Sequence, residues 1–352
     1  MPVSVHTTEP APFIPSKPWN KKTMPRTILA IRLQAMGDLV ITLPYLQHLR
    51  NSLPANCRID LVTREEVDAI PRNMDLFDRV YSIAGGRDLK KQLFYTGMML
   101  PKLVWQRYDV VIDLQNNIIS RIIRKALMPT AWSVFDRFSP IPAGESSRLT
   151  IEAIGLGKCF AAARYKLKNE TGHLEILKAN GWDGSSNLVV LNPAGAFTTR
   201  NWPIENYMEF TRLWLDRFPN TQLLMIGVDT IAEKASFLKQ HLGNKLIDLV
   251  NKTTAVQAFA VIQKARFVLS EDSGLMHMAW VSGIPTLAMF GSTRSDRATP
   301  IGKHTLLLHS GDLTCGNCML ETCIHGDTRC LTRYTAAFVF ENAMALISVQ
   351  VS

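Results

Sequence analysis

The chain has 352 residues, 47% of them hydrophobic, and a formal net charge of +9 at pH 7. This length and hydrophobic content predict a sizeable core and two domains, and no apolar stretch approaches the ~20 residues that a membrane-spanning helix needs. The positive charge predicts anionic partners, such as nucleotide phosphates or an acidic membrane surface. Because no helix-turn-helix, zinc-finger or RNA-binding signature accompanies the charge, nucleic acid is not expected among the partners.

Residues 1–25 are rich in proline and contain no apolar segment. This composition predicts a disordered tail rather than a secretory signal. The protein is therefore expected in the cytoplasm, where its six cysteines would stay reduced.

The first half of the chain alternates between short apolar runs and helical segments, which predicts a parallel sheet with helices on both faces. We expect strands at residues 28–33, 58–62, 79–83 and 109–114. A looser region follows at 140–163, and the same alternation then restarts. In the second half we expect strands at 188–192, 222–226, 266–270 and 285–290, with a helix at 204–217.

The turn at residues 34–38 joins the first strand to a helix, so Asp38 lies at the carboxyl edge of the sheet. Open α/β proteins place their ligands at this edge, and a carboxylate there is a candidate general base. The alternative is a structural role as the helix N-cap, which is a common use of aspartate at a helix start.

Two loops of the second half suit a phosphate. In residues 270–277 a strand ends and Ser273-Gly274 open a helix, so backbone amides would point outward, and Gly274 lets an anion approach closely. Asp272 would orient this loop or accept from a ligand hydroxyl, and His277 is either part of the site or a helix-packing side chain. In the other loop Arg200 offers a guanidinium fork that matches phosphate oxygens, or is an ordinary exposed arginine.

A nucleotide held by the second half, opposite Asp38 of the first, is a coherent geometry for group transfer. Other chemistries lack their motifs. The first turn has a single glycine, Gly37, which argues against a dinucleotide-binding dehydrogenase. The sequence also has no P-loop and no nucleophile elbow of a hydrolase.

Residues 89–108 mix lysine and arginine with large apolar side chains. This composition is typical of an interfacial amphipathic segment, although an ordinary surface helix with its apolar side in the core has the same pattern. Arg121, Arg124 and Lys125 follow on the next helix and form either a solvated or an anion-binding face.

Four cysteines lie within sixteen residues near the C-terminus, at positions Cys315, Cys318, Cys323 and Cys330. Thiolates are ligands of structural zinc, but these spacings are atypical of a two-knuckle site. The alternative is a set of free or redox-sensitive thiols.

Three stretches together resemble the signature regions of glycosyltransferase family 9, the bacterial heptosyltransferases of lipopolysaccharide core assembly. They are ILAIRLQAMGDLVITLPYLQHLR from residue 28, LNPAGAFTTRNWPIENYMEF from residue 191 and LSEDSGLMHMAWVSGIPTLAMFG from residue 269. The resemblance implies an α/β GT-B fold, in which two Rossmann-like parallel-sheet domains face each other across a cleft. It implies an acceptor domain at 26–165, a nucleotide-sugar domain at 166–334 and a C-terminal helix at 335–352 that packs back toward the first domain.

The resemblance also implies an inverting transfer without a catalytic metal, in which Asp38 deprotonates the acceptor hydroxyl. By position, the donor ADP-L-glycero-D-manno-heptose would be bound by Thr198, Thr199, Arg200, Glu233, Thr253, Asp272, Ser273, Gly274 and His277. Arg200 stands where the family commonly has lysine, which keeps the charge and changes its geometry. First-domain candidates for the acceptor are Arg64, Gln115, Asn116 and Arg121.

The acceptor that the resemblance implies is an anionic glycan on a lipid of the inner membrane. The protein would then work in the cytoplasm, peripherally on the cytoplasmic face of that membrane. Three other interpretations fit the same residues: a different nucleotide sugar, a protein acceptor, or a nucleotide-sugar-binding protein without catalysis.

Overall fold

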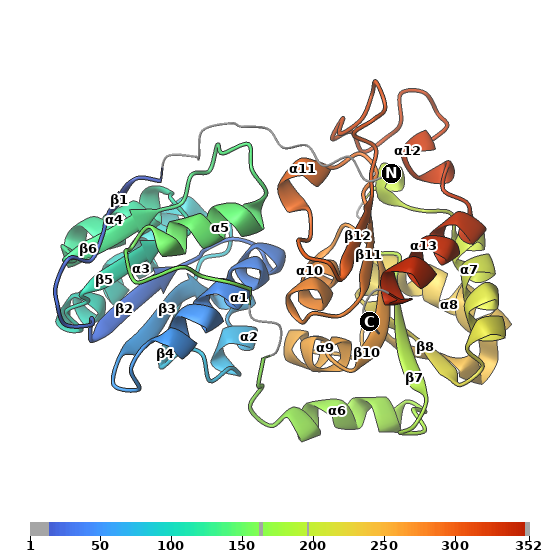
Figure 1. Cartoon of the computed structure of the whole chain (residues 1–352), viewed down its shortest axis with the longest axis horizontal. Coiled ribbons are helices and arrows are strands. Elements are labelled where there is room, and N and C mark those ends of the chain that lie inside the picture. Colours follow the sequence, from blue (N-terminus) through green and yellow to red (C-terminus); the bar gives the residue numbers. More distant parts are fainter. Residues whose placement is uncertain (1–13, 162–164, 196, 349–352) are drawn as a thin grey trace.

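The structure is a computed structural model that describes residues 14–161, 165–195 and 197–348. It contains two six-stranded sheets, one in each half of the chain, with helices on both faces of each sheet (Figure 1). The predicted α/β architecture with two parallel-sheet domains is confirmed.

The first domain is built from the following elements: β1 (Ser16–Lys17), β2 (Thr27–Ile31), α1 (Met36–Ser52), β3 (Arg58–Arg64), η1 (Glu65–Val67), α2 (Ala69–Arg72), β4 (Arg79–Ile83), α3 (Leu89–Trp105), β5 (Val110–Asp113), α4 (Ile118–Leu127), β6 (Ala131–Val134) and α5 (Ala143–Glu152).

The second domain is built from α6 (Glu170–Ala179), β7 (Asn187–Asn192), η2 (Thr198–Arg200), α7 (Ile204–Arg217), β8 (Thr221–Gly227), η3 (Asp229–Ile231), α8 (Ala232–Leu242), η4 (Gly243–Lys245), β9 (Leu246–Val250), α9 (Ala255–Ile262), β10 (Ala265–Glu271), α10 (Gly274–Val281), β11 (Thr286–Met289), α11 (Ser295–Ala298), β12 (Thr305–Leu308), α12 (Arg329–Thr332) and α13 (Ala336–Ser348).

Both sheets wind outward from a central strand. The strand order is β1-β6-β5-β2-β3-β4 in the first sheet and β12-β11-β10-β7-β8-β9 in the second. Neighbouring strands are parallel, except that β1 runs antiparallel to β6. The direction of winding reverses between β2 and β5, and again between β7 and β10. Open parallel sheets bind their ligands at such switch points, outside the carboxyl ends of the strands.

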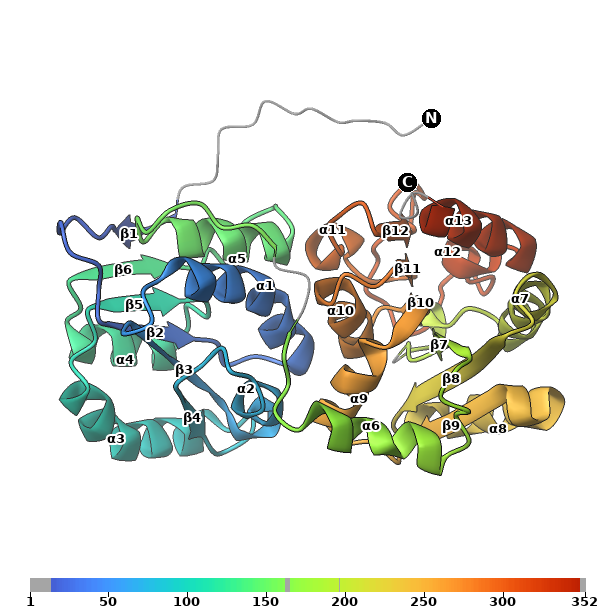
Figure 2. The ribbon, with the colours of Figure 1, turned by 60° about the horizontal axis from the view of Figure 1, so that its bottom comes forward.

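Helices between the two sheets join the domains. One apolar cluster extends from Leu43 and Leu46 of α1 to Phe259 of α9 and Met278 of α10, all buried. Helix α1 packs directly against α10 (Figure 2). Since apolar burial contributes ~25 cal/mol per Å², this shared core fixes how the two switch points face each other.

Part of the predicted N-terminal tail is ordered. Ser16 and Lys17 pair with Trp132 and Ser133 of β6, and the Trp19 amide donates to the Ile154 carbonyl oxygen at 2.7 Å. The prediction of a disordered tail over 1–25 is therefore wrong for residues 14–25, because an edge strand supplied partners that the local sequence does not reveal. Residues 1–13 lie outside the described residues.

The C-terminal helix does not pack toward the first domain as expected. Its buried residues Val339, Ala343 and Leu346 belong to the core on the outer face of the second sheet, and α13 lies against α7. Phe340 meets the rings of Phe210 and Trp214 at centroid distances of 6.2 and 6.4 Å. These apolar contacts hold residues 336–348 within their own domain; residues 349–352 lie outside the described part.

The link between the domains is more structured than the sequence predicted. The loose region contains α5, whose Ser147 and Thr150 are buried. Leu167 still bridges to Met74 of the first domain, so the chain changes domain just before α6, a few residues beyond the expected limit at 165/166. Among the described residues, no helix has the length and apolar character that crossing a membrane requires.

Candidate active site

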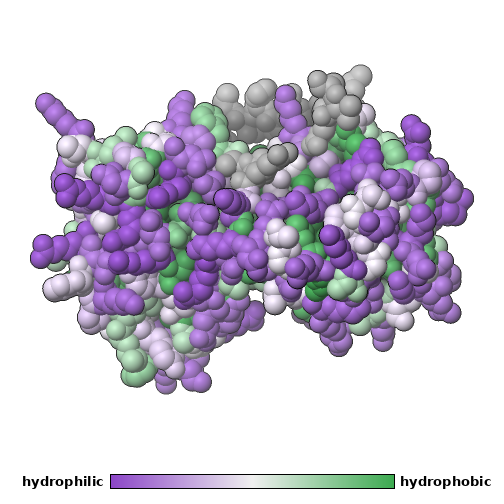
Figure 3. All heavy atoms as spheres, turned by 90° about the horizontal axis from the view of Figure 1, so that it is seen from below, coloured by the Kyte–Doolittle hydropathy of each residue, from purple (hydrophilic) through white to green (hydrophobic). Residues whose placement is uncertain are grey.

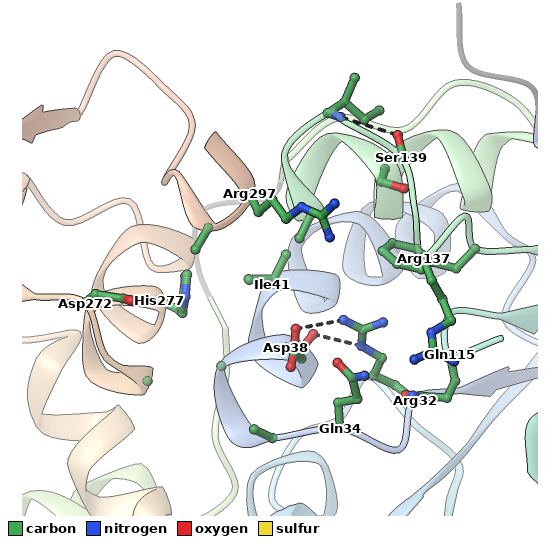
Figure 4. A pocket seen from close by; sticks show the side chains of 18 of the residues that line it. Arg32, Gln34, Asp38, Ile41, Gln115, Arg137, Ser139, Asp272, His277 and Arg297 are labelled. Carbon is green, nitrogen blue, oxygen red and sulfur yellow. Dashed lines mark hydrogen bonds and ion pairs between the residues drawn. The ribbon is translucent and has the colours of Figure 1, made fainter. Parts of the chain in front are cut away.

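The two switch points face each other across a cavity of about 550 Å³ (Figure 4). Its first wall comes from the loops after β2 and β5, the start of α1 and the segment after β6. Its second wall comes from the loops after β7 and β10, the start of α10, and α11. The charged residues that line it are Arg32, Asp38, Asp136, Arg137, Arg200, Asp272 and Arg297.

Asp38 is the third residue of α1, and its carboxylate faces the cavity. The cap position belongs to Ala35, whose side chain makes no capping hydrogen bond. The alternative interpretation of Asp38 as the N-cap is therefore wrong, because the helix begins two residues before it. The carboxylate is paired instead with Arg32, at 3.0 Å between Oδ1 and Nη2, and its side chain keeps 34% of its surface exposed.

Arg32 supports Asp38 from behind, and the sequence analysis did not single it out. It is almost fully buried, its Nε donates to the Asp38 carbonyl oxygen at 3.2 Å, and its Nη1 donates to the Leu114 carbonyl oxygen. The guanidinium lies 5.0 Å from the Phe135 ring centroid. Burial lowers the pKa of Arg32, and the Asp38 carboxylate opposes that effect. Arg32 thus fixes the carboxylate in one orientation; its sequence signal is an arginine directly after a buried strand.

Across the cavity lies the loop from Pro193 to Trp202, which we call the donor loop after the role that we propose for it below. Within it Arg200 has its Nη1 3.9 Å from Asp272 Oδ2, and its guanidinium stacks over Phe197 at 4.7 Å. Arg200 and Asp272 each expose 17% of their side chains. The guanidinium is thus oriented before any ligand arrives and can meet an anion with little reorganisation.

Glu271 holds the donor loop from inside and was also missed by the sequence analysis. It is fully buried at the end of β10, and its carboxylate accepts from the Gly195 amide at 2.6 Å and the Trp202 amide at 2.7 Å. Burial raises the pKa of Glu271 to about 7, while nearby Lys234 and the two amides oppose the rise. One side chain therefore fixes both ends of the segment that carries Arg200.

Lys234 and two glycines complete the support of the donor loop. Lys234 Nζ donates to the Pro193 carbonyl oxygen at 2.7 Å and to Asn201 Oδ1. A Cβ atom at Gly195 would overlap the Arg200 carbonyl group, and one at Gly291 would overlap the Thr199 carbonyl oxygen. Only glycine fits at these two close approaches.

The start of α10 meets the start of α1 at the centre of the cavity. Ser273 caps α10 through the Met276 amide and accepts from Asn192 Nδ2 at 2.6 Å. A Cβ at Gly37 would lie 2.9 Å from His277 Cδ2. Gly37 is therefore needed so that the two helices can approach, which is a packing role for the glycine of the first turn.

His277 lies buried between the two domains, opposite Asp38 in Figure 4. Burial lowers its pKa, and Asp272 and Asp38 oppose the shift. Its Nδ1 is buried without a hydrogen-bond partner among the described residues. The histidine packs the domain junction and also lines the cavity, so the packing role is confirmed and the role in the site stays a prediction.

The cavity gathers six of the ten residues expected for catalysis and donor binding: Asp38, Arg200, Asp272, Ser273, Gly274 and His277. Thr198 and Thr199 lie behind it, with hydroxyls that donate to the Glu321 and Leu320 carbonyl oxygens at 2.9 and 2.6 Å. Glu233, in the first turn of α8, and Thr253, before α9, follow the next two strands along the same sheet edge.

Of the four acceptor candidates, Gln115 lines the cavity, but its Oε1 accepts from the Leu33 amide at 2.9 Å. Asn116 donates to the Phe135 carbonyl oxygen, and Arg64 forms two hydrogen bonds to Glu66 at 3.0 and 2.9 Å. Arg121 points outward on α4. The structure instead brings Arg137 and Arg297 to the cavity, from a loop and a short helix that have no distinctive sequence pattern.

The cysteine cluster lies behind the donor loop. All four thiols are free and line a separate cavity of about 200 Å³ together with Thr199. Within the described ranges, no three histidine, cysteine, aspartate or glutamate side chains are placed to share a metal ion. The structure thus gives no support to a zinc site. Cys330 Sγ instead donates to the Thr199 carbonyl oxygen at 3.5 Å, so this segment braces the donor loop.

Two facing parallel-sheet domains with a cavity between them are the architecture of the GT-B fold. The sequence profile of glycosyltransferase family 9 (heptosyltransferase) matches residues 148–328. The chain belongs to this family.

Known proteins agree with this assignment. Lipopolysaccharide heptosyltransferase 1 of Pseudomonas aeruginosa is 26% identical over 323 residues, which cover 86% of this chain and 88% of the relative. The crystal structure of a family 9 glycosyltransferase from Veillonella parvula matches with a TM-score of 0.76 at 17% identity, covering 92% of this chain and 97% of that one. The ADP-heptose lipopolysaccharide heptosyltransferase II of Escherichia coli matches with a TM-score of 0.70 at 16% identity, covering 93% and 100%.

Proposed function

We propose that the protein transfers heptose from ADP-L-glycero-D-manno-heptose to an anionic, lipid-linked glycan of the lipopolysaccharide core. The observation that carries the proposal is that Asp38 lines one wall of the cavity while Arg200 and Asp272 line the other. The names of the relatives support the choice of sugar and acceptor: one acts on lipopolysaccharide, and another is named for ADP-heptose.

In the proposed step, Asp38 takes the proton of the acceptor hydroxyl while that oxygen attacks the anomeric carbon of the heptose. The bond from the anomeric carbon to the diphosphate oxygen breaks, and its electron pair leaves with ADP. Attack from the side opposite the leaving group inverts the anomeric configuration. Asp38 needs an open approach for this role, which agrees with its partial exposure.

Arg200 would stabilise the negative charge that develops on the departing diphosphate. The amides at the start of α10 would help, because a helix N-terminus favours an anion. Glu233 and Thr253, farther along the same edge, would take the ribose and the adenine. Arg200 and the amides of α10 would stabilise the negative charge of the leaving diphosphate, so the proposed step uses no metal.

The cavity suits an anionic acceptor. Arg137 and Arg297 reach the cavity from opposite domains, and Figure 4 shows Arg297 extending from α11 toward the first domain. Guanidinium groups bind phosphates and carboxylates well. Together with the net charge of +9, this supports an enzyme that works in the cytoplasm at the anionic surface of the inner membrane.

The test is a comparison of ADP, UDP, GDP and ADP-heptose by thermal shift and calorimetry, followed by transfer to a heptose-free core acceptor. A ligand that binds only the folded state raises the apparent stability, so we expect ADP and ADP-heptose to raise the unfolding temperature selectively. Arg200→Gln should lose most of the shift, and Arg212→Gln on the exposed face of α7 should keep it.

The other possible outcomes would each reject a different part of the proposed function. Preference for UDP or GDP would reject heptose as the sugar. ADP-heptose binding with transfer to a protein, and not to the core glycan, would reject the acceptor. Binding without turnover on either acceptor would reject catalysis in favour of a nucleotide-sugar-binding protein.

A further inference from the structure

The outer face of α3 and α4 exposes an unusual number of apolar side chains. Eighteen large hydrophobic residues are exposed among the described residues, and nine of them fall between residues 89 and 128. They are Leu89, Phe94, Tyr95, Met98, Val104, Trp105, Ile118, Ile122 and Met128. Single exposed apolar residues are normal, but a concentration of them marks an interaction site.

Helix α3 presents these residues at helical spacing on the side away from its sheet. Phe94, Met98 and Trp105 are 64%, 67% and 83% exposed, while Thr96 and Leu103 on the opposite side are buried. The core thus holds this helix by one side and leaves a second apolar stripe uncovered. The interpretation of residues 89–108 as a surface helix with one side in the core is confirmed, and the interfacial interpretation, which concerns the exposed side, stays a prediction.

Helix α4 lies beside α3 and repeats the pattern. Its outer side alternates Ile118, Ile122 and the following Met128 with Arg121 and Lys125, all exposed. Its inner side buries Ile119 and Ile123 in the same cluster as Leu103 of α3. The two outer sides therefore form one surface, which we call the α3/α4 face.

All charges within these two helices are positive. Neither α3 nor α4 contains an aspartate or glutamate. Lys102 and Arg124 are used locally, over the rings of Tyr81 and Trp132. The cations left on the outer side are Lys90, Lys91, Arg121 and Lys125, all of which are exposed.

The α3/α4 face also has a useful position. It lies on the side of the first sheet opposite α1 and α5, so it points away from the second domain (Figure 2). In Figure 3, apolar residues gather among hydrophilic ones at the lower edge of this domain, the edge where Figure 2 places α3. A partner could cover the face and leave the cavity open.

We propose that the α3/α4 face docks the enzyme on an anionic lipid bilayer. A helix that lies in the headgroup region needs apolar side chains interspersed with cations. The apolar side chains enter the acyl boundary, and the cations meet the lipid phosphates. A second copy of the chain is a poor occupant, because it would bring like charges together. The choice of a bilayer rests on the proposed function, whose acceptor is lipid-linked.

The test is binding of the full-length chain to vesicles, without donor or acceptor, so that its result is independent of transfer activity. We expect the protein to co-sediment with phosphatidylglycerol/phosphatidylethanolamine vesicles and not with phosphatidylcholine vesicles, and to be released by salt. Lys90→Gln/Lys91→Gln/Arg121→Gln/Lys125→Gln should weaken binding by more than about 10-fold.

A matched pair of double variants separates the α3/α4 face from apolar surface in general. Phe94→Ser/Met98→Ser removes side chains that are 64% and 67% exposed, and Phe160→Ser/Val228→Ser removes side chains that are 64% and 65% exposed elsewhere. We expect the first pair to lose about 10-fold in vesicle affinity, with unchanged transfer to a water-soluble acceptor fragment, and the second to stay within twofold. All four side chains lie on the surface, so both variants should fold.

Equal effects of the two pairs, or no preference for anionic vesicles, would overturn the proposal. So would sedimentation velocity that shows the wild type as an oligomer and the Phe94→Ser/Met98→Ser variant as a monomer, since the face would then join protein copies. Vesicle binding with no heptose transfer would leave the face in place and reject the proposed function instead.

Discussion

The two walls of the cavity are held in different ways. Asp38 depends on one residue, Arg32, and remains one-third exposed. Arg200 sits in a loop that is tied by Glu271, Lys234, two glycines and the cysteine-bearing segment behind it. The difference fits their proposed tasks: the donor wall must present a fixed charge to a leaving group, whereas the acceptor wall needs a base that an incoming hydroxyl can reach.

Because Asp38 is held by one residue, we expect a single substitution at Arg32 to impair catalysis. In Arg32→Met the carboxylate of Asp38 loses its only ion pair among the described residues and is free to reorient. A misplacement of about 1 Å can cost ~10²-fold in rate, so we expect kcat to fall by about that factor, with donor affinity nearly unchanged. Steady-state kinetics measure this, and Arg32→Lys should recover part of the loss because it keeps the charge without the fork.

The donor wall should respond through stability and affinity. A Cβ in Gly291→Ala would overlap the Thr199 carbonyl oxygen, and such overpacking costs about 1–3 kcal/mol. Urea unfolding and ADP calorimetry should both show a loss. Gly97→Ala on α3 is the control, because its Cβ would meet nothing within 4 Å; a helical glycine in open space should gain about 0.5–1 kcal/mol on substitution. Equal behaviour of the two variants would contradict the packing argument.

Glu271 should make the donor wall sensitive to pH. Its pKa is about 7 in the folded protein and about 4.3 when unfolded, so between these values the folded state binds a proton that the unfolded state lacks. Its contribution to the unfolding free energy therefore falls as pH rises from about 4.3 to 7, by at most ~1.4 kcal/mol per pH unit. Urea titrations at several pH values should show that Glu271→Gln loses this slope.

The same variant should bind the donor less tightly above pH 7. Both carboxylate oxygens of Glu271 accept from amides, whereas a glutamine would turn its NH₂ group toward one of them. Unchanged ADP affinity in Glu271→Gln would show that the donor loop keeps its shape without this carboxylate.

The smallest effect is expected far from both walls. Arg212 on α7 pairs with Glu209 and Asp216, but its side chain is 58% exposed. Exposed ion pairs contribute only ~0–1 kcal/mol. Arg212→Ala should therefore stay within about 0.5 kcal/mol in unfolding experiments and leave transfer unchanged; a larger effect on transfer would show that perturbing α7 reaches the site.

The sequence predicted the strands whose own residues form a clear apolar run. Residues 28–31 are all apolar because β2 is buried on both faces. Strands β1, β6, β9 and β12, which lie at or next to sheet edges, were not predicted. The two residues of β1 are too few to form a pattern and depend on pairing with β6. The position of α13 was wrong for a similar reason, since the aromatic side chains of α7 decide it.

In the candidate site, too, some residues could be predicted from the local sequence and others could not. Asp38, Arg200 and Asp272 were identified because each follows a strand at the carboxyl edge. Arg32 and Glu271 were not, because charged residues at the end of apolar strands look like strand termini until the structure shows that both are buried. For the thiol cluster the sequence left two interpretations open, structural zinc or free thiols; the structure agrees with free thiols and gives their segment a bracing role.

The most direct test of the account is the Asp38→Asn variant, which keeps the size of the side chain and removes its ability to take a proton. We expect heptose transfer to fall by about 10²–10⁴-fold, while calorimetry gives ADP-heptose an affinity within a few-fold of the wild type. Transfer at a near-normal rate would contradict the role of Asp38 as the general base. Loss of donor binding together with transfer would show that Asp38 maintains the cavity rather than the chemistry.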